Sequence, residues 1–197
     1  MTELAQPFLA PWASFFTMTA TAAATLIGLM FVVVTLVSGI ERTGDSEVGL
    51  STFSTPTVIH FGAALLVSAI LIAPWPRLAG AFVLVTLVGL AGVAHMSRVT
   101  GKARRLTAYA PDMEDWLWYT ILPFVAYASV LAGALSMPLA PGASIWILGG
   151  TTTLLIFMGI RNAWDVVTYL TMERIKRPEQ APPPASSSQP PAVVRED

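Results

Sequence analysis

The feature that most constrains this chain is the length of its segments without charged side chains. Asp, Glu, Lys, Arg and His are all absent between Glu3 and Glu41, and again from Trp116 to Ile160. A helix that crosses about 30 Å of hydrocarbon needs about 20 mostly apolar residues, and each segment is longer than that. Charged residues make up only 12% of the chain, against about 25% in soluble domains. We therefore expect a membrane protein.

Two further segments are almost free of charge. Positions 48–76 hold His60 as their one ionisable side chain, and positions 78–97 hold His95. The long apolar segment after Trp116 is divided by Met137–Gly142, whose prolines and glycine predict a turn. We predict an all-α bundle of five spans, approximately Phe15–Ile40, Thr57–Ala73, Leu78–His95, Trp116–Ser136 and Ser144–Leu170.

The basic residues are distributed unevenly between the two ends of these spans. With five spans, the loops after the first and third spans share one side with the C-terminus. That side carries Arg42, Arg98, Lys102, Arg104, Arg105, Arg174, Lys176 and Arg177. The opposite side carries Arg77 alone. Because cytoplasmic loops retain Lys and Arg, we predict that the N-terminus is outside and the C-terminus is cytoplasmic.

The segments outside the bilayer are short. Residues 1–14 are predicted as an outer N-terminal segment, residues 15–172 as the bundle, and residues 173–197 as a cytoplasmic tail. The tail is rich in proline and serine with little apolar surface, which predicts disorder. The basic cluster is expected to contact anionic lipid headgroups, at about 1 kcal/mol per residue; its members are Arg98, Lys102, Arg104 and Arg105. A chain with 11 basic and 12 acidic residues does not fit a nucleic-acid-binding protein.

Small residues recur at helical spacing in two of the spans. Ala20, Ala24 and Gly28 follow one another in the first span, and Ala128 and Ala132 in the fourth. In lipid, helices associate where small side chains let their backbones approach. We therefore predict helix-packing faces here, some within the chain and one between protomers or against another membrane protein.

The polar groups predicted at membrane depth gather toward the cytoplasmic side. Arg161, Asn162 and Asp165 lie near the inner end of the fifth span, and His60 and His95 lie at the inner ends of the second and third. Charged groups inside a span are costly and are functional candidates by default. The pattern predicts a polar vestibule in a channel- or transporter-like oligomer. The structural alternative is an Arg161–Asp165 ion pair that fixes the depth of the span.

Other functions remain open at this point. His60 and His95 are candidates for axial haem ligands, for metal ligands with Asp165, or for a pH-dependent gate. An accessory subunit of a larger membrane complex is a further alternative. The chain has no cysteine, no Gly-x-Ser-x-Gly elbow and no His-Glu-x-x-His motif. We therefore expect no enzymatic activity, and neither a cofactor nor a metal ion is required.

One stretch of the first span resembles a known group of sequences. Ala23-Ala-Thr-Leu-Ile-Gly28-Leu-Met-Phe31-Val-Val is similar to the first helix of uncharacterised small bacterial integral-membrane proteins. The resemblance covers about a dozen residues of one helix and carries no site, substrate or cofactor. It implies a multi-pass protein of the bacterial inner membrane.

Overall fold

The computed structural model describes residues 5–40, 47–103 and 113–176, and the elements within these ranges are helices. The short helix α1 (Ala5–Leu9) and the 3-10 turn η1 (Ala10–Trp12) lead into α2 (Ala13–Ile40). Two long helices follow, α3 (Glu47–Ile72) and α4 (Leu78–Ala103). The next span consists of α5 (Met113–Trp116), the π-helical η2 (Leu117–Ile121) and α6 (Leu122–Ser136). The last helix is α7 (Pro141–Lys176).

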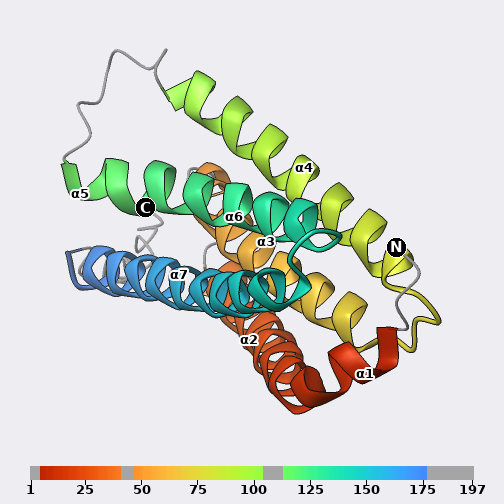
Figure 1. Cartoon of the computed structure of the whole chain (residues 1–197). Helices are drawn as coiled ribbons and strands as arrows, with labels where there is room; N and C mark the ends of the chain where they lie inside the picture. Colours follow the sequence, from red (N-terminus) through yellow and green to blue (C-terminus); the bar gives the residue numbers. More distant parts are fainter. Residues whose placement is uncertain (1–4, 41–46, 104–112, 177–197) are drawn as a thin grey trace, which may run out of the picture.

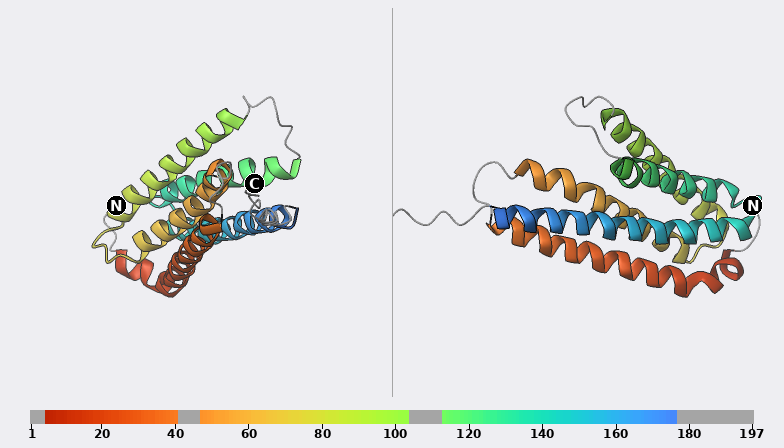
Figure 2. Two further views of the ribbon diagram at one scale, coloured as in Figure 1. Left: turned by 180° about the vertical axis from the view of Figure 1, so that it is seen from behind. Right: turned by 90° about the vertical axis from the view of Figure 1, so that its left-hand side faces the viewer.

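The long helices pack side by side in a bundle (Figure 1). α2 packs on α3, α3 on α7, α7 on α6 and α6 on α4, with smaller contacts between α3 and α4 and between α2 and α7. In the side view of Figure 2, α1 lies at one end of the bundle and the C-terminal part of α7 at the other. We name these the α1 end and the α7 end. α3 begins at the α7 end, so α3 and α7 run antiparallel.

The apolar outward faces of the helices indicate that lipid surrounds the bundle. Four of the described helical segments are long and apolar enough to cross a membrane, namely Pro7–Thr35, Leu78–Gly101, Leu117–Ser136 and Pro141–Asp165; the apolar part of α3, Thr57–Ile72, is shorter. In the first of these only 17% of the most apolar window is buried in the bundle. Soluble monomers rarely expose apolar surface on this scale, whereas lipid tails solvate it. The protein is therefore a multi-pass membrane protein.

The hydroxyl groups on the outward faces do not need water. Thr21 Oγ1 donates to the carbonyl oxygen of Thr17 at 2.8 Å, and Thr25 Oγ1 donates to that of Thr21 at 2.8 Å. Both threonines are exposed on α2. Because each hydroxyl is satisfied within its own helix, these residues can face hydrocarbon without an unpaired donor.

The interior is packed with apolar side chains from all the long helices. Phe16, Val67, Val85 and Leu155 are among its fully buried members. One polar contact crosses the α2–α3 interface, where the hydroxyl groups of Thr19 and Ser68 lie 2.9 Å apart.

The five predicted helices are confirmed. The predicted turn is present but shorter, since it occupies residues 137–139, and Pro141 and Gly142 are the first residues of α7. Two predicted boundaries differ most from the structure. α3 begins at Glu47 rather than at Thr57, and Pro56 lies inside this helix. α4 continues past His95 to Ala103, into the segment predicted as a loop. The apolar pattern locates the part of a helix that lies in lipid, whereas backbone hydrogen bonding continues beyond that part. Proline is tolerated inside a membrane helix where neighbouring groups satisfy the freed carbonyl.

Several predictions concern residues that the structure does not describe. Arg42, Arg104, Arg105 and the tail from residue 177 lie outside the described residues, as does the side chain of Lys102. Arg98, the remaining member of the predicted headgroup cluster, is exposed near the end of α4. The predicted disordered tail begins too early, because α7 continues to Lys176 and includes positions 173–176.

Candidate functional site

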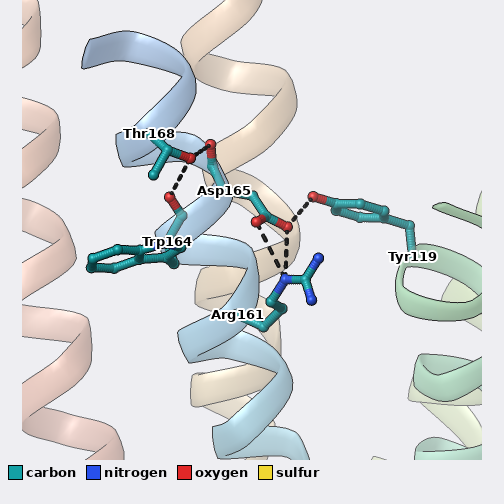
Figure 3. A network of polar contacts seen from close by, with 5 residues as sticks. All are labelled: Tyr119, Arg161, Trp164, Asp165 and Thr168. Atoms are coloured by element: carbon teal, nitrogen blue, oxygen red, sulfur yellow. Dashed lines mark hydrogen bonds and ion pairs between the residues drawn. The ribbon is translucent and has the colours of Figure 1, made fainter. Parts of the chain in front are cut away.

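The ion pair predicted from the spacing on α7 is present. Arg161 Nε donates to both carboxylate oxygens of Asp165, at 3.3 Å each (Figure 3). The two side chains are 34% and 32% exposed. Residues four apart on a helix share one face, so α7 alone is sufficient to bring this pair together.

Two aromatic side chains from the preceding span complete the site. Tyr119 donates its phenol hydrogen to Asp165 Oδ2 at 3.1 Å, and the Arg161 guanidinium carbon lies 4.9 Å from the centre of the Trp118 ring. A cation over an indole face is stabilised by about 0.5–2 kcal/mol, depending on desolvation. Both aromatic residues belong to η2. We call Trp118, Tyr119, Arg161 and Asp165 the ion-pair site.

The π-helical geometry of η2 has a local cause. Pro123 has no backbone N–H, so it cannot donate to the carbonyl of Tyr119, four residues earlier. In the same segment the N–H of Leu122 bonds to the carbonyl of Leu117, five residues back. Single π turns of this kind occur frequently at functional sites. Pro123 therefore accounts for the π turn, and this turn carries Trp118 and Tyr119.

The ion-pair site lies toward the α7 end of the bundle. Arg161 is about 30 Å along α7 from Pro141 at 1.5 Å per residue, which is similar to the thickness of the hydrocarbon core. Trp164, one turn from Arg161, is 67% exposed, as expected for an indole at headgroup level. Thr168 donates to the backbone carbonyls of Trp164 and Asp165 at 3.0 Å. The site is therefore close to the edge of the apolar layer.

His60 does not join the ion-pair site. Its ring is buried on α3, and His60 Nδ1 lies 3.0 Å from the hydroxyl oxygen of Tyr127 on α6. The two rings are tilted, with centroids 5.8 Å apart. Gly92 of α4 makes room for this pair, because a Cβ there would overlap the Tyr127 ring. His60 and Tyr127 thus form a second, interior polar pair.

The other two predicted vestibule residues have different surroundings. His95 on α4 is half-buried. Asn162 is buried on α7 beside the ion pair, yet its side chain makes no hydrogen bond with the part of the chain that the structure describes. The structure therefore pairs Arg161 with Asp165 and His60 with Tyr127, and it pairs the Asn162 side chain with neither.

The donor set does not assemble a metal centre. Among residues 5–40, 47–103 and 113–176, no three His, Cys, Asp or Glu side chains gather closely enough to hold an ion. The ion-pair site can offer a cation to an anionic group and a carboxylate to a cationic one. Its chemistry is therefore that of charge recognition at the edge of the membrane.

Most residues of the predicted small-residue faces are not buried against the described helices of the same chain. Ala24, Gly28 and Ala132 are exposed, and Ala20 and Ala128 are half-buried. The close helix contacts instead involve other glycines, which the spans also contain. Gly89 approaches the backbone of Leu131, and Gly159 lies against the Phe61 ring. The Ala20–Gly28 face is therefore directed away from the other described helices.

Comparison with protein-family models, with curated proteins and with solved structures found no match. The resemblance of the first helix to small bacterial membrane proteins accordingly stays a prediction.

Sequence reasoning missed the two tyrosines that complete the polar pairs. Tyr119 and Tyr127 both lie in an apolar span, where a phenol hydroxyl needs a hydrogen-bond partner. This requirement could have identified both tyrosines, because His60 and Asp165 were already predicted to lie at membrane depth on the same side of the bilayer.

Proposed function

We propose that this protein is a non-catalytic, channel- or transporter-like homo-oligomer of the bacterial inner membrane. Its polar vestibule opens at the α7 end and is lined by Arg161 and Asp165 together with the half-buried His95, whereas His60 and Asn162 are buried within the bundle. The observation that carries the proposal is the Arg161–Asp165 ion pair, held by Tyr119 and Trp118 and still one-third exposed.

Exposure of the ion pair favours a functional role over a purely structural one. Full burial would remove the hydration of both charges, whereas the one-third exposure observed here keeps both groups accessible. Here Tyr119 and Trp118 of the preceding span hold the Asp165 carboxylate and the Arg161 guanidinium in a fixed orientation while both charges remain accessible. Accessible and preorganised charges are what a permeating or transported ion requires at the mouth of a pathway.

Orientation follows from the basic residues. α4 starts directly after Arg77 at the α1 end, and it ends, five residues after Arg98, toward the α7 end, where the C-terminal part of α7 also lies. Under the positive-inside rule, the α7 end and the vestibule are cytoplasmic and α1 is outside. Anionic lipid headgroups are then the partners of the basic cluster at the inner surface.

The orientation is tested by cysteine accessibility, for which the absence of native cysteine provides a clean background. Single-cysteine variants Ala10→Cys and Leu139→Cys are expected to react with a membrane-impermeant maleimide in intact cells. Gly101→Cys is expected to react only after the membrane is permeabilised. All three positions are exposed. Labelling of Gly101→Cys in intact cells, with the other two protected, would reverse the proposed orientation.

The transport proposal is tested by flux in proteoliposomes loaded with a pH-sensitive dye or an anion-sensitive dye. We expect Arg161→Ala and Asp165→Ala each to lower the flux by about tenfold or more. Charge-assisted hydrogen bonds contribute about 1.5–3 kcal/mol, and about 1.4 kcal/mol corresponds to a factor of ten.

The matched control for the flux assay is Arg98→Ala. It removes an exposed arginine near the end of α4 and leaves the ion-pair site intact, so we expect flux close to that of the original protein. Equal flux in folded Arg161→Ala, Asp165→Ala and unsubstituted protein contradicts the proposal, as does the absence of any flux.

One observation favours a second function, an accessory subunit of a larger membrane complex. Among the described residues, no other helix comes within 4 Å of a Cβ placed on Gly28, and Ala24 on the same face is exposed, so this face is open to another helix. This function expects a monomer in detergent and no flux. It also expects a co-purifying membrane protein that is lost when Gly28 is enlarged to leucine.

A further inference from the structure

The interior holds polar side-chain atoms that no part of the described chain satisfies. Asn162 is 2% exposed, and neither its amide nitrogen nor its amide oxygen makes a hydrogen bond. Thr57 on α3 is 0% exposed, and its hydroxyl also lacks a partner in the described ranges. A buried polar group left unpaired costs about 1–3 kcal/mol, so these groups are expected to have a ligand.

The register of α3 and α7 places these two residues at the same level of one interface. Gly159 of α7 lies against the ring of Phe61 of α3. Thr57 is four residues before Phe61, and Asn162 is three residues after Gly159. Because the two helices are antiparallel, both steps lead toward the α7 end, by about 6 Å and about 4.5 Å respectively.

We propose that Thr57 and Asn162 bind internal water between α3 and α7. An amide offers both donors and an acceptor, and a hydroxyl offers one of each kind. Water matches such a mixed set, since a buried water molecule makes about three hydrogen bonds to otherwise unsatisfied groups. A metal cation would use only the two oxygen atoms and would leave the Asn162 nitrogen unpaired.

The location of this water site gives it a wider role. Thr57 is one turn from His60, which pairs with Tyr127 on α6. Asn162 is adjacent to Arg161 and three residues from Asp165, the ion pair that contacts Tyr119. Water at Thr57 and Asn162 therefore lies within about one helical turn, along α3 or α7, of a member of each polar pair. It extends the hydrated region of the protein into the bundle, whether or not an ion crosses there.

Radiolytic hydroxyl labelling of the full-length protein in nanodiscs tests this proposal. Met158 is one turn from Asn162 on α7, and Met158 and Met137 are both buried, at 0% and 2% exposure. Water at the site generates hydroxyl radicals beside Met158, so a short X-ray pulse is expected to oxidise Met158 several-fold more than Met137. Equal, low oxidation of both methionines overturns the proposal.

Two variants test whether the oxidation of Met158 comes from water bound at Thr57 and Asn162. Asn162→Leu removes the amide and is expected to lower Met158 oxidation to the level of Met137. The control is Thr152→Val, because Thr152 is buried on the same helix and already donates to the carbonyl of Gly149 at 2.9 Å. We expect it to leave the labelling unchanged. Undiminished Met158 oxidation in folded Asn162→Leu contradicts the assignment of the water to this residue.

Thermal unfolding provides an independent readout. If water satisfies Asn162, Asn162→Leu leaves the Thr57 hydroxyl without that water and lowers the midpoint of unfolding. If the amide is truly unpaired, leucine removes an unfavourable group and raises the midpoint. A raised midpoint therefore overturns the proposal.

Discussion

Asp165→Leu is expected to destabilise the folded bundle by about 2 kcal/mol, because hydrogen bonds to charged groups contribute about 1.5–3 kcal/mol. The substitution removes the acceptor of Arg161 Nε and of the Tyr119 hydroxyl at once. Both side chains then lose the Asp165 carboxylate. Because the pair is about one-third exposed, solvent screening keeps the cost below that of a fully buried pair. Denaturant titration of the protein in mixed micelles measures this change.

A double-mutant cycle separates the interaction energy of the ion pair from the effect of removing each charge. Replacing both Arg161 and Asp165 with leucine removes both charges of the pair from the edge of the apolar layer, so the double variant is expected to be more stable than Asp165→Leu alone. Arg98→Leu is the control for removing one exposed arginine elsewhere, and we expect a change within about 0.5 kcal/mol. Additive effects of the two leucine substitutions would show that the ion pair contributes nothing to the fold.

Gly89→Ala is expected to destabilise the protein by about 1–3 kcal/mol, the usual range for overpacking. A Cβ on Gly89 would lie 2.8 Å from both the Cα and the backbone nitrogen of Leu131. Those atoms belong to the backbone of α6, so no side-chain rotation relieves the overlap, and α4 must move away from α6. Thermal unfolding in detergent is the measurement, with Gly89→Leu expected to lower the midpoint further.

Gly28→Ala is the matched control, and the expected sign is opposite. A Cβ on Gly28 meets no atom within 4 Å, and alanine favours the helix over glycine by about 0.8–1.0 kcal/mol. We therefore expect a small gain in stability. A loss at Gly28 comparable to the loss at Gly89 would indicate that α2 packs against another protein chain through this face.

The positions of the helices were predictable because they depend on local composition. A long segment without charge partitions into lipid, and in lipid its backbone must bond internally. The predicted starts at Leu78 and Phe15 agree with α4 and α2 to within a few residues. The predicted start at Thr57 failed because polar residues before it continue the helix outside the most apolar part.

The site was predictable where its members share one helix. Arg161 and Asp165 are four residues apart, so their contact needs only helical geometry. The contacts of Tyr119 with Asp165 and of Tyr127 with His60 join separate helices. They depend on the rotation of each helix about its axis, and on the π turn that reorients Tyr119.

Local composition is sufficient to predict that the chain forms long apolar helices joined by short connections, because burial in lipid depends on the summed hydrophobicity of each segment. Which face of each helix contacts another helix is seen only in the packed bundle. Ala23 is buried while Ala24 beside it is exposed, although both residues are alanine. In a membrane the outer face of a helix is as apolar as the inner face, so hydrophobicity cannot distinguish them, and close packing between particular side chains makes the choice.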